Sequence, residues 1–334
     1  MNGWGSCMKI CIPGAGAIGG HIAFRLAAAG HEVSVVARGA HLDAMRQRGQ
    51  LGFTEGADVS YAPVSASANP ADFGPQDAVI VGVKATGLAA MADLLGPVVG
   101  PQTLVYFPQN GMPWWYPVSA ETLPYALPDL AVFRVKQRFL SILKPHQIAA
   151  GTVYSGNEVR EPGIIYNSSP GRNSLTIAAI DPEGREATEA LRAAIDSSGL
   201  GATTPGNLRT AMWTKLVQNM SGSGIALATR NQTAISRHDA RLGELYIRIM
   251  TEGKAIAEAW GYPVSLDPVE ALSRAPYHRP SLLQDFEQGR PMEIGEIVLA
   301  PAAFARAAGV PCPSLDAVAG IVARLAMDKG LYSE

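Results

Sequence analysis

Six residues near the N-terminus have the types and spacing that could bind a phosphate group. Gly14-Ala15-Gly16-Ala17-Ile18-Gly19 matches GxGxxG; it follows a short apolar run, residues 8–13, and opens a helical pattern, residues 18–29. The first glycine of such a loop allows a tight turn, the second lets the backbone approach a pyrophosphate, and the third lets helix and strand pack closely. The helix start adds free N–H groups that favour negative charge. We therefore expect Gly14, Gly16, Ala17, Ile18 and Gly19 to bind a dinucleotide, although a glycine-rich turn without a ligand has the same pattern.

The residue after the second predicted strand bears on which dinucleotide binds. Residues 31–37 form this strand, and Arg38 follows it where an NAD site would place a carboxylate for the ribose hydroxyl. A guanidinium can instead pair with the 2′-phosphate and stack on adenine, so the sequence favours NADP. The alternative is a solvated surface arginine.

Lys84 ends another predicted strand, residues 77–83, at the sheet edge where ligands bind, so we expect it to contact cofactor or a carboxylate substrate.

The elements that position these residues change in type along the chain. Strands over residues 8–13, 31–37, 77–83 and 103–107 alternate with helices over residues 18–29 and 88–99, which predicts a parallel sheet. Strands over residues 148–158, 163–166 and 174–179 are expected to extend that sheet, before a helix over residues 183–198. After Pro205-Gly206 the pattern is helical over residues 207–229, 240–260, 281–288, 293–308 and 314–328. The predicted class is α/β, with an N-terminal Rossmann-type dinucleotide-binding domain (residues 1–206) and a C-terminal all-helical domain (207–334).

Composition excludes several classes of protein. The 334 residues carry 27 Lys and Arg against 29 Asp and Glu, a net charge of −2, so a broad basic surface for nucleic acid is not expected. No apolar stretch reaches the roughly 18 residues of a membrane span. Three cysteines are too few for a disulfide framework, and the six histidines have no metal-site spacing, so we expect a cytoplasmic protein without a metal.

Three further motifs, together with the glycine-rich loop and Arg38, resemble the ketopantoate reductase (2-dehydropantoate 2-reductase) family. The motifs are Gln109-Asn110-Gly111-Met112, the run from Trp213 to Asn219 (WTKLVQN), and Ser281-Leu282-Leu283-Gln284-Asp285 followed by Glu293-Ile294. Residues 149–165 also look like the family's mid-chain strands. The resemblance spans nearly the whole chain and implies an enzyme of pantothenate biosynthesis that reduces a 2-oxo acid with NADPH in a cleft between two domains. It implies catalytic roles for Lys215 and Glu293, substrate binding by Asn110, Asn219 and Ser281, and cofactor contacts from Lys84 and Asn110.

The chemistry of these residue types agrees with that implication. Hydride transfer to a ketone builds negative charge on oxygen, which a cation stabilises and a proton must neutralise. An ammonium on a helix does both, so Lys215 is the expected general acid, and this requires it to lie near the nicotinamide. Asn219 is four residues on, on the same helical face, and Glu293 could hold the ammonium or the new hydroxyl. Each residue also has an ordinary interpretation, as an exposed lysine or a carboxylate in a first helical turn.

The chain departs from the family pattern at several substrate-shaping positions. Pro113-Trp114-Trp115 follows Asn-Gly, Ser223 and Gly295 replace an Asn and an Asp, Val298-Leu299 replaces Asn-Gly, and His278 lies near another family Asn. Two alternatives therefore stay open: a reductase of a bulkier 2-oxo acid or an imine, and a non-catalytic NADP(H)-sensing protein. The aromatic segment 113–145 could cover the substrate site, be a structural insertion or form a dimer contact. The oligomeric state is open, with a homodimer as one option.

Overall fold

The computed structural model describes residues 7–119 and 122–333, which divide into two compact units. The first unit comprises Met1–Gln109 and Val135–Leu208, and the second comprises Asn110–Arg134 and Arg209–Glu334. The expected boundary at residue 206 lies close to the observed change at Leu208. Residues 110–134, however, group with the helical unit although the sequence pattern placed them in the N-terminal domain.

A seven-stranded sheet forms the centre of the first unit, in the order β13-β8-β7-β6-β1-β2-β5. Its strands are parallel except β13, which runs antiparallel to β8. The apolar runs predicted as strands are therefore neighbours at the centre of the sheet, where both faces are covered. The strand bounds are β1 Lys9–Pro13, β2 Glu32–Val36, β5 Ser65–Ser67, β6 Ala78–Ile80, β7 Leu104–Pro108, β8 Ile148–Gly151 and β13 Ala178–Ala179.

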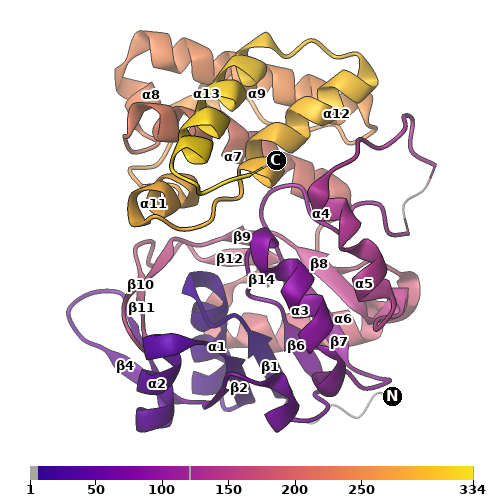
Figure 1. Cartoon of the computed structure of the whole chain (residues 1–334), viewed down its shortest axis with the longest axis vertical. Helices are drawn as coiled ribbons and strands as arrows, with labels where there is room; N and C mark the ends of the chain where they lie inside the picture. The colour runs from indigo at the N-terminus through magenta and orange to yellow at the C-terminus, as the bar shows by residue number, and fades with distance from the viewer. Residues whose placement is uncertain (1–6, 120–121, 334) are drawn as a thin grey trace. The chain divides into compact units, whose positions relative to one another are not determined.

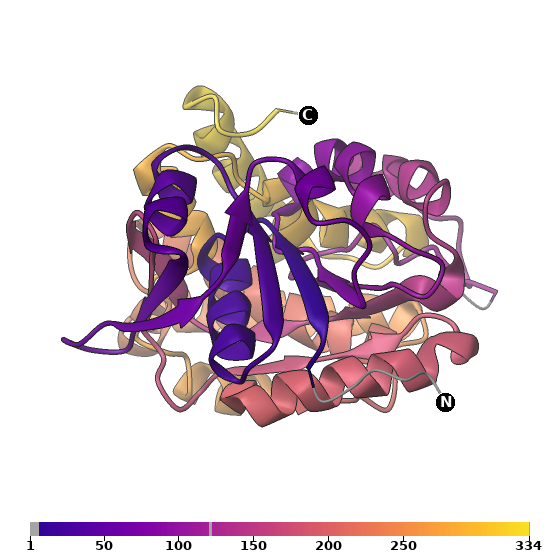
Figure 2. The ribbon, with the colours of Figure 1, turned by 90° about the horizontal axis from the view of Figure 1, so that it is seen from below.

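Helices cover the two faces of this sheet. Figure 2 shows α1 (Ala17–Ala28) beside β1 and β2, and α6 (Arg185–Ile195) lies on the same side. Side chains alternate between faces along β7: Tyr106 joins the core under α1, whereas Phe107 packs edge-to-face on Phe139 of α5 (Lys136–Leu140) at 5.1 Å. Two further helices, α2 (Gly39–Arg48) and α3 (Leu88–Leu94), follow β2 and β6.

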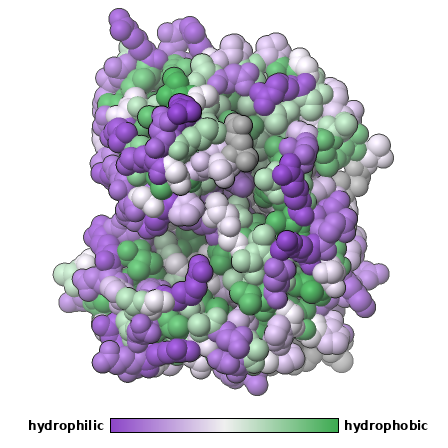
Figure 3. All heavy atoms as spheres, in the orientation of Figure 1, coloured by the Kyte–Doolittle hydropathy of each residue, from purple (hydrophilic) through white to green (hydrophobic). Residues whose placement is uncertain are grey.

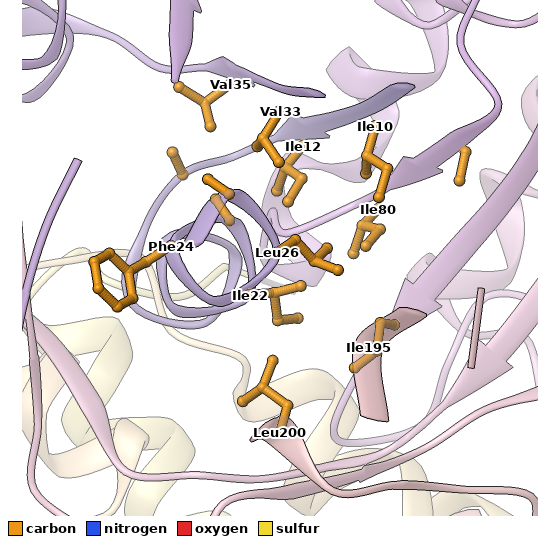
Figure 4. Close-up of a cluster of buried hydrophobic side chains, with 14 of the residues drawn as sticks. Ile10, Ile12, Ile22, Phe24, Leu26, Val33, Val35, Ile80, Ile195 and Leu200 are labelled. Carbon is orange, nitrogen blue, oxygen red and sulfur yellow. The ribbon is translucent and has the colours of Figure 1, made fainter. Parts of the chain in front are cut away.

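The main core of the first unit lies between α1 and the sheet. Ile22 and Leu26 of α1 meet Ile10 and Ile12 of β1, and Ile195 closes the cluster from the end of α6 (Figure 4). All five side chains are at most 2% exposed. Burying an aliphatic side chain contributes roughly 1.5–3 kcal/mol, so this cluster fixes α1, and with it the glycine-rich loop, at the ends of β1 and β2.

The mid-chain strands do not all extend the main sheet, and that expectation was wrong. Only β8 and β13 do so. The others join strands from elsewhere in the chain in two further sheets, one of four strands and one of three. The chain leaves the main sheet at Gly151, where the Thr176 carbonyl oxygen is so close that any side chain would collide with it. These strands are β3 Gln50–Thr54, β4 Ser60–Pro63, β10 Asn157–Glu161 and β11 Ile164–Asn167 in one sheet, and β9 Val153–Tyr154, β12 Ser174–Thr176 and β14 Ala202–Thr203 in the other.

The second unit is helical apart from its loops (Figure 1). The five helices predicted here begin and end within a residue or two of their expected bounds, with Glu293 lying one residue before its helix. The helices are α4 Ala131–Arg134, α7 Leu208–Thr229, α8 Ile235–His238, α9 Ala240–Ala259, α10 Pro268–Ser273, α11 Ser281–Gln288, α12 Ala300–Ala308 with a preceding π-helical turn Gly295–Leu299, and α13 Pro313–Asp328. Three short helices, α4, α8 and α10, were not predicted.

Four of the six aromatic residues of segment 113–145 are buried in cores, whereas Phe133 is partly buried and Tyr125 is 38% exposed. Trp114, Trp115 and Tyr116 are at most 1% exposed. The Tyr116 ring lies 5.3 Å from Phe304 and 6.4 Å from Trp213, measured between centroids. Packing therefore explains why this segment is rich in aromatic residues. The number of aromatic residues thus gives no support to the hypothesis that the segment covers the substrate site. Residues 120 and 121 of the segment lie outside the described residues.

Polar side chains occupy much of the face of each unit that Figure 3 presents. Within residues 7–119 and 122–333, no helix is both long and apolar enough to cross a membrane. Cys7, Cys11 and Cys312 are free thiols.

Candidate active site

The glycine-rich loop has the geometry that its pattern predicts. Gly14 has φ +88°, and a Cβ there would lie 2.6 Å from Val83 Cγ1. A Cβ on Gly19 would lie 2.1 Å from the Gly14 carbonyl oxygen, so only glycine lets α1 approach the loop. In contrast, no atom lies within 4 Å of the position that a Cβ on Gly16 would take. Gly16 is the N-cap residue of α1, and no side chain accepts a hydrogen bond from the first N–H groups of the helix there. The loop thus leaves room beside Gly16 and uncapped N–H groups at the start of α1, as a pyrophosphate requires.

Gly82 belongs to the same arrangement and was missed in the sequence. It follows β6, and a Cβ on it would lie 2.5 Å from the Gly14 carbonyl oxygen and 2.8 Å from Gly19 Cα. The Gly82 N–H donates to the Pro13 carbonyl at 2.8 Å. A glycine at the end of a buried strand was the available signal, since it marks a close approach of backbone.

Arg38 and Lys84 follow the carboxyl ends of β2 and β6, which lie on either side of β1 in the sheet. Arg38 lies two residues after the end of β2 and is exposed. It is the N-cap residue of α2, and its backbone is extended. Lys84 follows the end of β6 and is half-buried. Both residues therefore lie at the edge of a parallel sheet at which α/β proteins bind their ligands.

In the second unit, α7 presents Lys215 and Asn219 on one face. Trp213, Leu216 and Val217 are fully buried, whereas Lys215 and Asn219 are half-buried. Burial lowers the pKa of Lys215 from its usual 10.5 to about 8. An ammonium with a pKa close to neutral pH is a better proton donor than an ordinary lysine.

The Asn110-Gly111 turn rests on the segment that follows Glu293. The Met112 N–H donates to the Glu296 carbonyl at 2.8 Å. Gly111 has φ +84°, and a Cβ on it would lie 2.9 Å from Glu296 Cβ. Only glycine satisfies both the backbone angle and the close approach, so Gly111 fixes the position of Asn110 against this segment.

Glu296 is a candidate site residue that the sequence did not reveal. Burial, and then the negative charge of Glu293, raise the pKa of Glu296 to about 7. It lies in a π-helical turn, Gly295–Leu299, a conformation frequent at functional sites. The signal was the spacing of two carboxylates three residues apart, but i, i+3 pairs on exposed helices are common, and only the tertiary burial distinguishes this one.

Ser281 begins α11 and is exposed, and its hydroxyl has no hydrogen-bond partner within the described parts of the chain. Asp285, four residues on, is 1% exposed and accepts from Arg290 Nε at 2.9 Å. Its carbonyl accepts from the Arg290 N–H. Asp285 therefore holds the loop that leads from α11 to Glu293. His278 lies on the loop before α11, and its carbonyl accepts from the Thr233 N–H.

An aromatic cluster joins the three segments that carry these residues. Tyr116 follows the Asn110 turn, Trp213 precedes Lys215, and Phe304 lies on α12 beyond Glu293. The Trp213 Nε1–H donates to the Tyr116 hydroxyl at 3.3 Å, and the Trp213 and Phe304 rings lie 5.4 Å apart. The structure thus places the Asn110 turn against Glu296, whose carboxyl lies within reach of the charge of Glu293. It assigns Lys215, Asn219 and Ser281 to the same unit, and the glycine-rich loop, Arg38 and Lys84 to the other.

Comparisons with known proteins agree with these motifs. The family model "Ketopantoate reductase PanE/ApbA" matches residues 10–181, and the model of its C-terminal part matches residues 207–326. A 2-dehydropantoate 2-reductase of Mesorhizobium japonicum is 36% identical over 98% of this chain and its own full length. The crystal structure of a PanE/ApbA family ketopantoate reductase from Ralstonia eutropha JMP134 has a TM-score of 0.79 at 26% identity, covering 97% of this chain and all of that one. A D-mandelate dehydrogenase ternary structure with NADH shares the fold, with a TM-score of 0.81 at 19% identity over 97% of this chain and all of that one. With both family models matched along most of its length, and a relative at this identity, the chain belongs to the ketopantoate reductase family.

Proposed function

We propose that this protein is an NADPH-dependent reductase that converts a 2-oxo acid to the 2-hydroxy acid, with ketopantoate as substrate and pantoate as product. Lys215 is the observation that carries the proposal. It is a half-buried lysine on a helix, with its pKa lowered to about 8. The names of the relatives, 2-dehydropantoate 2-reductases among them, support the substrate.

When bound, NADPH would supply the hydride that reduces the carbonyl carbon of the substrate. The Lys215 ammonium stabilises the charge that develops on the carbonyl oxygen and then donates its proton to that oxygen. Asn219 orients the substrate from the same face of α7. Glu293 accepts a hydrogen bond from the ammonium or from the new hydroxyl, and Ser281 and Asn110 bind the remaining polar groups of the substrate.

NADP is the proposed cofactor. The open space beside Gly16 and the uncapped start of α1 fit a pyrophosphate. Arg38 would pair with the 2′-phosphate, and Lys84 would contact the cofactor from the end of β6, on the other side of β1. Arg38→Ala should raise the KM for NADPH far more than the KM for NADH, because NADH has no 2′-phosphate. Equal effects on both cofactors would refute this role for Arg38.

The assay that tests the function follows NADPH absorbance with a panel of 2-oxo acids that includes ketopantoate and aromatic 2-oxo acids. Ketopantoate should have the highest kcat/KM. A much higher kcat/KM for a bulkier acid would overturn the substrate assignment but not the reaction. NADPH binding without turnover of any acid would favour the sensing alternative.

The spatial requirement that Lys215 lie near the nicotinamide stays a prediction, which a crystal structure with NADP and a substrate analogue tests. A cytoplasmic setting fits three free thiols and is part of the proposal. The homodimer also stays a prediction, which light scattering tests.

A further inference from the structure

His41 connects the glycine-rich loop to a turn more than a hundred residues later. It lies in the first turns of α2, three residues after Arg38. Its Nε2 lies 2.8 Å from the Ala15 carbonyl oxygen, and the Gly163 N–H donates to its Nδ1 at 2.8 Å. Ala15 lies between the first two glycines of the loop, and Gly163 lies between β10 and β11.

The hydrogen bonds determine the protonation of the ring. A backbone N–H can only donate, so Nδ1 must accept with its lone pair. The single proton of the neutral ring is then on Nε2, which donates to the Ala15 carbonyl. Burial lowers the pKa of His41, which also favours the neutral ring, although the Ala15 bond acts in the opposite direction. A positively charged ring could not accept from Gly163.

Both partners of His41 are themselves held in place. The Ala15 N–H donates to the Val36 carbonyl at 3.3 Å, so His41 completes the hydrogen bonding of the residue. Gly163 has φ +77°, and a Cβ on it would lie 3.0 Å from Ala44 Cβ of α2. Its carbonyl accepts from the Gly52 N–H of β3 at 2.8 Å. The ring therefore links the loop to a turn that two other elements fix.

We propose that His41 is a positioning residue for the dinucleotide: its neutral imidazole holds the Ala15 peptide, and so the N–H groups that follow it, in the orientation that binds the pyrophosphate. The inference rests on the proposed cofactor function. Without the Nε2–H donor the Ala15 carbonyl loses this hydrogen bond and the peptide that follows it is held less firmly, so part of the binding energy of the cofactor is then spent on ordering the loop. His41 acts on cofactor affinity and not on the chemical step.

Three variants of the full chain test this role. His41→Phe removes both hydrogen bonds and should raise the Kd for NADPH about tenfold, the equivalent of one or two lost hydrogen bonds, with little change in kcat at saturating NADPH. His41→Gln keeps one donor and one acceptor and should bind within about threefold of the wild type. His31→Phe is the matched control. His31 Nδ1 also accepts from a backbone N–H, that of Met8 at 3.2 Å, but at the opposite end of β1.

NADPH fluorescence titration and initial rates give the Kd and the KM-against-kcat split, and thermal unfolding without cofactor gives the stability of each variant. Wild-type affinity in His41→Phe, or an equal loss of affinity in His41→Phe and His31→Phe, would overturn the positioning role. Failure of His41→Gln to restore binding would do the same. If the wild type binds neither NADPH nor NADH, the proposed cofactor function fails instead, so the two failures are distinguishable.

Discussion

The lowered pKa of Lys215 predicts where the reduction must lose activity as the pH rises. Only the ammonium form can donate the proton, and burial places its pKa at about 8 instead of the usual 10.5. At pH 9 about one tenth of Lys215 is protonated, whereas an ordinary lysine would be almost fully protonated. Above its midpoint, kcat/KM for the reduction should fall about tenfold per pH unit.

The measurement is kcat/KM for the 2-oxo acid from pH 6 to pH 10, followed by NADPH absorbance. Oxidation of the 2-hydroxy acid with NADP needs the free amine, so it should rise through the same midpoint. Lys215→Ala should lower kcat by about 10²–10⁴ in both directions while NADPH still binds.

Glu296 supplies a control for this profile, because its raised pKa of about 7 lies close to the midpoint expected for Lys215. Glu296→Gln should leave the midpoint near pH 8 in place and remove any change near pH 7. A reduction rate that stays constant to pH 10, or a midpoint that moves in Glu296→Gln, would refute the assignment of the alkaline limb to Lys215.

Three further predictions concern the framework of the site. Gly111→Ala should destabilise the protein more than Gly261→Ala, because both glycines have φ near +84° but only Gly111 would bring a Cβ to 2.9 Å from Glu296; equal losses in urea unfolding would show that the turn can shift. As the pH rises from 4.5 past 7, the Glu296→Gln variant should become more stable relative to the wild type, by at most about 3 kcal/mol. The reason is that the folded wild type binds the Glu296 proton more tightly than the unfolded chain does, and it loses this stabilisation when Glu296 is deprotonated. A difference in stability that is the same at pH 5 and pH 8 would contradict the raised pKa. Phe304→Ala should cost roughly 3–5 kcal/mol, measured by thermal unfolding, because it removes the ring that Trp213 and Tyr116 both contact; a loss below about 1 kcal/mol would mean that the cluster collapses around the cavity.

Much of the fold could be predicted from local patterns. The apolar runs at residues 8–13 and 103–107 form central strands, and the periodic segments after Pro205 form helices close to their expected ends, because burial of an apolar face determines both patterns. The sheets that the strands of residues 148–179 join could not be predicted, since strand pairing depends on partners far along the chain. β11 pairs with β3, more than a hundred residues earlier.

The sequence by itself determined the chemistry: a GxGxxG loop between strand and helix, Arg38 in place of a carboxylate, and Lys215 four residues before Asn219 on one helical face. These features depend on residue type and on spacing within one element, which local geometry fixes. Only the tertiary structure decided that Glu296 lies buried beside Glu293, that Gly82 must be glycine, and that His41 holds Ala15. Desolvation and close approach depend on what surrounds an atom in space, and residues distant in the sequence supply those surroundings.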